Sequence, residues 1–125
     1  MSILGKLKMN IIRATLKPNL LAQFQMSEIK TAKFTADQVN DRLRLEAKGI
    51  LKGHNIESNV YKPDLILSEK RDVVDLFLSE IKEQITFDEI HKAVLNFDFE
   101  NGILETTIFY ELSGKKLKEI IKTEF

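Results

Sequence analysis

The sequence predicts a single α+β domain over residues 1–125, in which an antiparallel sheet containing a 93–111 hairpin has three or four helices packed on one face. Three observations support this prediction. An Asn-Gly pair separates two runs of alternating apolar and polar residues, and apolar residues recur at helical spacing elsewhere. A chain of 125 residues also has the length of one average domain.

The hairpin has the strongest local signal. Asn101-Gly102 is typical of a two-residue type I′ turn, which would pair residues whose numbers sum to 203. In this register Phe99 faces Leu104 on one side of the hairpin, and Asp98 faces Glu105 on the other. One face is then apolar and the other mostly polar, as a half-buried sheet requires.

The N-terminal stretch predicts an amphipathic helix over residues 3–16. Its apolar residues share one face at a period of 3.6, and lysines and an arginine line the opposite flank. Alternation over residues 7–11 leaves a strand as the alternative. Pro18 disfavours helical geometry at Lys17, which predicts that the helix ends there.

A second helix is predicted to begin after Thr35. Thr35 and Gln38 have the spacing of a capping box, and Gly53 suits a helix end. Four residues between them follow at helical spacing: Val39, Leu43, Ala47 and Ile50. The alternation of Leu43, Leu45 and Ala47 keeps a strand open as the alternative.

The middle of the chain predicts an extended segment over residues 55–67, followed by a helix over 69–84 that Ser68 caps. The helical segment is apolar over a broad arc, which predicts a central place in the core. Thr86 and Glu89 again have capping-box spacing and predict a short helical turn.

A last helix is predicted after Ser113. Leu117, Ile120 and Ile121 would point inward. The lysines of this segment, at positions 115, 116, 118 and 122, would point outward.

The charges are segregated, although 19 basic and 19 acidic side chains give a formal net charge of zero. Residues 1–52 carry ten basic and four acidic groups, a net of +6, and residues 53–113 carry five and thirteen, a net of −8. Residues 114–125 are +2. Complementary fields of this kind steer association between proteins.

Composition excludes several classes of site. The absence of cysteine excludes disulfides, zinc–thiolate sites and thiol nucleophiles. No uncharged apolar stretch approaches the roughly 20 residues that span a bilayer. The expectation is a soluble, cytoplasmic protein without a membrane span and without a cofactor.

Few residues suggest chemistry. Asp98 opposite Glu105 would place like charges face to face, which points to a cation or acid–base pair or to an exposed hairpin tip. His91 follows Asp88 and Glu89 closely enough for a carboxylate to orient its ring. No metal or catalytic pattern is complete, so an enzyme is disfavoured and no catalytic or metal-binding residue is assigned.

The predicted function is a small non-enzymatic protein-binding or assembly module, acting through protein–protein contacts and self-association as a homo-oligomer. Its partner-binding residues would be Lys6, Arg13 and Lys17 on the basic side, and Asp72, Asp75 and Glu83 on the acidic side. Nucleic acid is disfavoured as a partner by scarce arginine.

Two alternatives remain open. One is a nucleic-acid or membrane-surface accessory protein that uses the basic N-terminal helix. The other is a small ligand-binding protein or enzyme with a carboxylate and histidine site built from Asp88, His91, Asp98 or Glu105.

Overall fold

A computed structural model describes residues 14, 16–70 and 85–124 of the chain. Residues 14 and 16–24 are helical, and a short 3-10 helix, η1, spans Leu67–Lys70. The rest is dominated by six strands: β1 (Met26–Asp37), β2 (Arg42–Leu51), β3 (Glu57–Ile66), β4 (Glu89–Asp98), β5 (Ile103–Leu112) and β6 (Lys115–Glu124).

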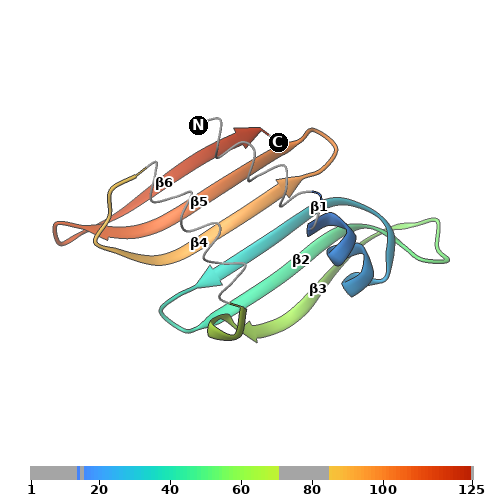
Figure 1. The fold of residues 1–125 in the computed structure, drawn as a ribbon, viewed down its shortest axis with the longest axis horizontal. Helices are drawn as coiled ribbons and strands as arrows, with labels where there is room; N and C mark the ends of the chain where they lie inside the picture. The colour runs from blue at the N-terminus through green and yellow to red at the C-terminus, as the bar shows by residue number, and fades with distance from the viewer. Residues whose placement is uncertain (1–13, 15, 71–84, 125) are drawn as a thin grey trace.

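The strands form one antiparallel sheet in the order β3-β2-β1-β4-β5-β6 (Figure 1). Each half of the sheet is a meander of three consecutive strands, and the two halves meet where β1 pairs with β4. The prediction of three or four helices packed on one face is wrong, because the described residues form mostly antiparallel sheet with a single short helix.

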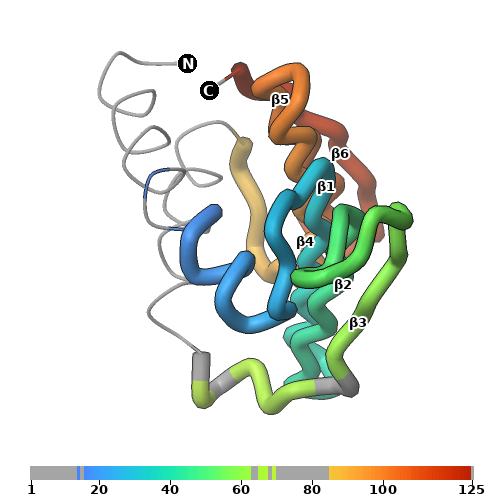
Figure 2. Tube along the Cα trace, turned by 90° about the vertical axis from the view of Figure 1, so that its right-hand side faces the viewer, coloured from blue at the N-terminus to red at the C-terminus, as the bar shows by residue number. Residues whose placement is uncertain are grey.

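The helix packs on one face of the sheet, which we call the core face (Figure 2). Leu20 and Phe24 of the helix are buried there with Phe34 of β1 and with Leu95 and Phe97 of β4. Side chains alternate along each strand, so every second residue lies on the opposite, open face.

Pro18 lies within the helix, so the predicted end at Lys17 is wrong. Burying Leu20 and Phe24 on the sheet contributes about 1.5–3 kcal/mol each, which stabilises the helix after the proline. The predicted helix over 3–16 lies almost wholly outside the described residues.

Residues 35–50 form parts of β1 and β2, and the predicted helix there is wrong. The strand alternative holds, since Leu43, Leu45 and Ala47 are all buried on the core face. Residues four apart share a face in both a helix and a strand, so Leu43 and Ala47 satisfied both patterns. The segment is a strand because its backbone pairs with β1 on one side and with β3 on the other.

The segment after Ser113 is strand β6, and the predicted C-terminal helix is wrong. Ser113 and Gly114 have φ values of 53° and 76°, as in a type I′ turn, and Leu112 pairs with Lys115. This turn sends the chain back along β5, whose outer edge would otherwise lack a strand partner.

The middle of the chain is partly described. The extended segment predicted over residues 55–67 is confirmed for Glu57–Ile66, which form β3, whereas Leu67 begins η1. The predicted helix over 69–84 overlaps η1 at its start and otherwise lies outside the described residues. The predicted helical turn at Thr86 and Glu89 is wrong, because residues 85–88 are not helical and Glu89 begins β4.

The 93–111 hairpin is confirmed, but its register differs by two residues from the prediction. Phe97 pairs with Leu104 and Asp98 with Ile103, so paired numbers sum to 201. A shift of two leaves each side chain on its face, and the predicted apolar and polar faces hold. Glu105 faces Asn96, so the predicted opposition of Asp98 and Glu105 is wrong.

Asp98 closes the loop of this hairpin. Its Oδ1 accepts hydrogen bonds from the backbone N–H groups of Glu100 and Asn101 at 3.1 Å each, and its Oδ2 accepts one from the Asn101 side-chain amide at 2.7 Å. Asx bonding of this kind favours the four-residue loop over the two-residue turn.

The β1–β2 loop repeats this arrangement. Asp37 accepts bonds from the backbone N–H groups of Val39 and Asn40 at 3.0 and 3.1 Å, and from the Asn40 side-chain amide at 2.8 Å. The pKa of each aspartate is lowered from its ordinary value, chiefly by the asparagine side chain. The charged form therefore stabilises both loops.

These pKa shifts predict acid sensitivity. A lowered folded-state pKa gives stability that is complete above the unfolded pKa of about 3.9 and is lost as the pH falls through the folded value. The Asp37→Asn/Asp98→Asn variant is expected to be less stable than the native chain at about pH 7, with the difference shrinking toward about pH 2.5. Urea denaturation at both pH values, with Glu124→Gln as the control, measures this. A difference independent of pH would contradict it.

Candidate functional site

Most of the predicted partner-binding residues lie outside the described part of the chain: Lys6, Arg13, Asp72, Asp75 and Glu83. Lys17 is described and half-buried, and its Nζ lies 5.8 Å from the centre of the Phe99 ring. Lys17 thus contacts the β4–β5 loop of its own chain, and its role toward a partner stays a prediction.

The residues of the alternative carboxylate–histidine site have separate local roles. The Asp88 carboxylate accepts a hydrogen bond from the Ser113 backbone N–H at 2.9 Å, and Asp98 closes its own loop. Glu105 pairs across the sheet with a lysine of β6. His91 instead lies beside two other glutamates at the start of β4, described below.

Strand β6 is the most exposed element of the sheet. It has ten residues, of which eight are exposed, and it lies at one side of the sheet in Figure 1. In the described part of the chain, no strand pairs with its outer side. Half of the backbone N–H and C=O groups of an outer strand point away from the sheet, where another strand can bind them.

The two faces of β6 differ in chemistry. The cross-strand partners of Lys116, Lys118 and Lys122 lie on the open face of β5, so these lysines share that face. Leu117 and Ile121 lie on the core face with Glu119 between them, and Leu117 is 39% exposed. Ile120 lies with the lysines on the open face and is 53% exposed. The sequence signal for this strand was weak: Lys116, Leu117 and Lys118 alternate after the Ser-Gly turn, but the alternation ends at Glu119.

A small apolar cluster continues the core face toward β6. Ile90, Ile108 and Tyr110 are buried at its centre, and the residues packed around them are only partly buried: Ile85, Phe87, Leu112 and Ile121. The Tyr110 hydroxyl donates a hydrogen bond to Glu119 of β6 at 3.4 Å. The core face is therefore still apolar where β6 begins.

Phe109 lies on the open face between two lysines. Lys92 of β4 and Lys118 of β6 are its cross-strand partners, and each Nζ lies 5.6 Å from the ring centre. These contacts hold the two ammonium groups near the outer half of the sheet.

A row of polar side chains crosses the whole open face. The registers place one residue of each strand in line, from β3 to β6: Tyr61, Glu46, Lys33, Asn96, Glu105 and Lys122. Lys33 and Glu46 lie 4.0 Å apart, and Glu105 and Lys122 lie 3.8 Å apart. Acidic and basic groups thus alternate along the row.

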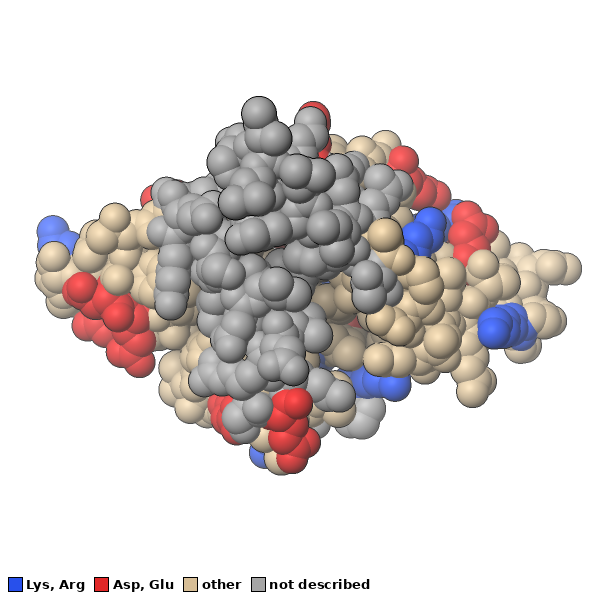
Figure 3. All heavy atoms as spheres, viewed as in Figure 1, with Lys and Arg blue, Asp and Glu red and all other residues tan. Residues whose placement is uncertain are grey.

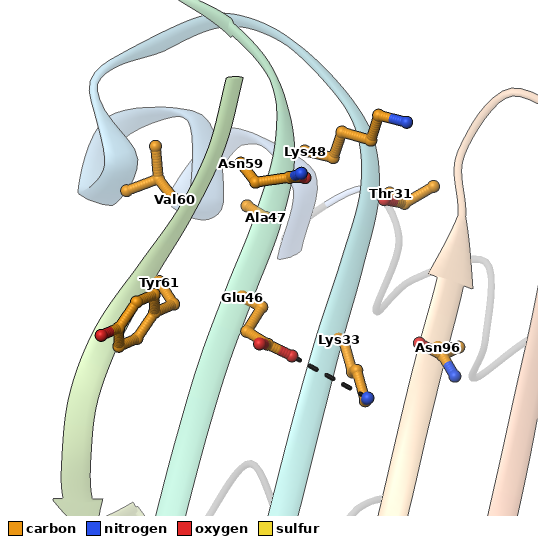
Figure 4. Close-up of a pocket in the computed structure, with 9 residues that line it drawn as sticks. All are labelled: Thr31, Lys33, Glu46, Ala47, Lys48, Asn59, Val60, Tyr61 and Asn96. Atoms are coloured by element: carbon orange, nitrogen blue, oxygen red, sulfur yellow. Dashed lines mark ion pairs between the residues drawn. The ribbon is translucent and has the colours of Figure 1, made fainter. Parts of the chain in front are cut away.

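The row borders a shallow hollow of about 380 Å³ (Figure 4). The hollow lies where short side chains, those of Thr31, Asn59 and Asn96, are bordered by longer ones. The longer side chains are those of Lys48 and Tyr61. Its lining offers amide, ammonium and carboxylate groups with one exposed aromatic ring. It contains no group placed as a nucleophile beside a base.

The opposite outer strand, β3, is a poorer edge for binding. Its pairing with β2 shifts register between Leu43 and Leu45, and its sequence contains Pro63, which has no backbone N–H. Glu57 at its start is held by Lys30 and Lys48, each at 2.9 Å. Hydrogen bonds from these lysines lower the pKa of Glu57.

Acidic and basic side chains are interspersed over the described surface. On the side shown in Figure 3 both kinds lie toward the periphery, and on the open face they alternate along the row. A phosphate backbone binds best to a surface of one positive sign.

One cluster has the residue types of a metal site. Glu89 and His91 of β4 and Glu111 of β5 each offer a ligand atom, and these three atoms lie within 4.8 Å of one another.

None of the described helical residues form a segment long and apolar enough to cross a membrane. No protein-family model, curated protein or solved structure significantly matches this chain, so its geometry carries the functional argument.

Proposed function

We propose that this chain is a non-enzymatic protein-binding module that takes up an extended, acidic segment of a partner protein as an added strand beside β6. The single observation that carries the proposal is the outer side of a ten-residue strand that has three lysines on one face and with which no strand of the described residues pairs. Strand addition gives affinity through main-chain hydrogen bonds and specificity through alternate side chains.

The lysines define one half of the partner's pattern. A strand beside β6 places every second side chain on the open face, next to Lys116, Lys118 and Lys122. Opposite charges across a strand pair are favourable and like charges are destabilising. The bound segment is therefore acidic at alternate positions.

The core face defines the other half. Leu117 and Ile121 lie beside the partly buried cluster around Tyr110, and an added strand would cover them. Each fully buried aliphatic side chain contributes about 1.5–3 kcal/mol. The positions of the segment beside Leu117 and Ile121 are therefore apolar, and the proposed ligand carries acidic residues on one face and apolar residues on the other.

A second copy of the chain fits this edge less well. Pairing β6 with itself, antiparallel about Ile120, places Lys118 opposite Lys122 on both sides of the centre. Lysines on an outer strand commonly prevent such pairing between like edges. Charge complementarity thus selects an acidic partner over self-association.

The proposal predicts binding of a blocked ten-residue peptide of alternating glutamate and valine, in preference to one of alternating lysine and valine. Each exposed ion pair contributes about 0.2–1 kcal/mol. The Lys116→Glu/Lys118→Glu variant is therefore expected to bind the glutamate peptide about tenfold more weakly and to gain affinity for the lysine peptide. Fluorescence anisotropy measures both affinities, and the gained affinity shows that the variant is folded.

The matched control is Lys48→Glu/Lys52→Glu, which makes the same change in net charge away from β6. It is expected to bind the glutamate peptide almost as the native chain does. Equal loss in both variants would overturn the proposal. So would tighter binding of a single-stranded oligonucleotide than of the glutamate peptide, or a stable dimer by light scattering without peptide.

A further inference from the structure

Glu89, His91 and Glu111 converge at the end of the β4–β5 pair where the apolar cluster lies. The His91 Nε2 atom is 3.5 Å from Oε2 of Glu111 and 3.7 Å from Oε2 of Glu89. The His91 side chain is 25% exposed and that of Glu111 35%, so both are partly enclosed, while Glu89 is open to solvent at 68%.

The strand register opposes two like charges at this point. Glu89 and Glu111 are direct cross-strand partners. Such a pair destabilises a sheet unless a positive charge lies between the carboxylates. Among the described residues, the ion pairs that the structure gives these two glutamates are both with His91, which is charged only when protonated.

A β-bulge brings the imidazole to this place. The register of β4 and β5 shifts between Ile90 and Lys92, and His91 is the extra residue. Bulges re-aim side chains and are frequent beside functional sites. The His91 carbonyl also accepts a hydrogen bond of 2.9 Å from the Gln38 backbone N–H, which anchors the bulge to the β1–β2 loop.

The two distances from His91 Nε2 suit neighbouring ligands of one metal ion, and all three ligand atoms lie within 4.8 Å of one another. Zinc lies about 2.0–2.2 Å from imidazole nitrogen and carboxylate oxygen, so neighbouring ligands of a tetrahedral site are about 3.4 Å apart. The two separations from His91 Nε2, 3.5 and 3.7 Å, are close to this value. They are also longer than an ordinary hydrogen bond between the same groups.

We propose that Glu89, His91 and Glu111 bind a divalent transition-metal ion of the Zn²⁺ type, with a fourth position open to water or another ligand. One imidazole and two carboxylates favour such an ion over Ca²⁺ or Mg²⁺, which prefer oxygen ligands alone. Asp88 is not a ligand, because its carboxylate holds the β5–β6 turn. The cross-strand partner of Glu111 on β6 is Lys116, whose ammonium group competes with the ion.

Isothermal titration of the whole chain with ZnCl₂ tests the site. One ion is expected per chain, and His91→Gln is expected to weaken binding by about tenfold or more. The matched control is His54→Gln, which changes the other histidine of the chain, exposed in the β2–β3 loop. It is expected to bind as the native chain does. Equal Zn²⁺ affinity in the two variants would overturn the proposal, and so would a native chain that binds no Zn²⁺.

Thermal unfolding of Glu89→Gln provides a second readout. Without metal this variant is expected to unfold at a slightly higher temperature than the native chain, because it removes the opposed negative charges. Added ZnCl₂ is expected to raise the unfolding temperature of the native chain and to raise that of the variant much less. An equal rise in both would contradict the assignment of Glu89 as a ligand.

Discussion

Replacing Phe97 with alanine is expected to lower the free energy of unfolding by about 3–5 kcal/mol. Phe97 is only 1% exposed and lies on β4 at the centre of the sheet. Its ring is 5.5 Å from that of Phe34 and 5.8 Å from that of Phe99, centre to centre. Its cross-strand partner on β1 is Ala32, which is too small to fill the resulting cavity.

Urea denaturation of Phe97→Ala measures this loss, and Phe109→Ala is the matched control. Phe109 is partly exposed on the open face of the neighbouring strand, so its removal leaves no enclosed cavity. A clearly smaller loss is expected there. Similar losses for the two variants would mean that the core does not lie on the helix side of the sheet.

Gly49→Ala is expected to destabilise the chain by about 1–3 kcal/mol. Gly49 of β2 pairs with Ile29 of β1 next to a register shift, and the backbones approach closely there. An added Cβ would overlap the Glu28 carbonyl oxygen and would lie 2.9 Å from the Ile29 Cα. These are backbone atoms of a paired strand, so relief requires the ladder itself to move.

The control for Gly49→Ala is Gly53→Asn in the β2–β3 loop. Gly53 has a φ of 79° and no atom within 4 Å of an added Cβ, and asparagine tolerates this conformation better than most residues. Thermal unfolding is expected to show a small change for Gly53→Asn and a large one for Gly49→Ala. An unchanged unfolding temperature for Gly49→Ala would show that β1 and β2 are not packed this closely.

Face assignment in the hairpin was predictable from the sequence, whereas its register was not. Alternation of period two decides which side chains of β4 and β5 share a face, and any even shift preserves that result. Two registers were possible, in which the numbers of paired residues sum to 203 or to 201, and the length of the loop decided between them. Asp98 accepts three hydrogen bonds within a four-residue loop, which the Asn101-Gly102 signal alone did not reveal.

The two helices that were wrongly predicted, after Thr35 and after Ser113, were predicted for the same reason. Leu43 and Ala47 are four residues apart, as are Leu117 and Ile121, and residues at this spacing share a face in a helix and in a strand. The capping signals at Thr35 and Ser113 coincided with strand and turn positions. A neighbouring strand that pairs with the backbone decides between the two, and a single segment does not show its neighbour.

The candidate metal site was likewise only partly predictable from the sequence. The sequence identified His91 as a titratable group near the carboxylates of Asp88 and Glu89, because they are neighbours in the chain. The structure places Glu89 beside His91, whereas Asp88 holds the β5–β6 turn. It also adds Glu111, which is twenty residues away and reaches His91 through strand pairing and a bulge. Sequence proximity does not report contacts between strands.

The sequence by itself determined that the chain has no thiol chemistry, that its charges are segregated, and which residues of the 93–111 hairpin face a core. Only the tertiary structure decided that β2 and β6 are strands, that β6 lies at an outer edge, and that Glu89 opposes Glu111. The physical reason is that composition and period are local properties. A strand's partners, and hence its free edge, are set by backbone pairing between segments far apart in the chain.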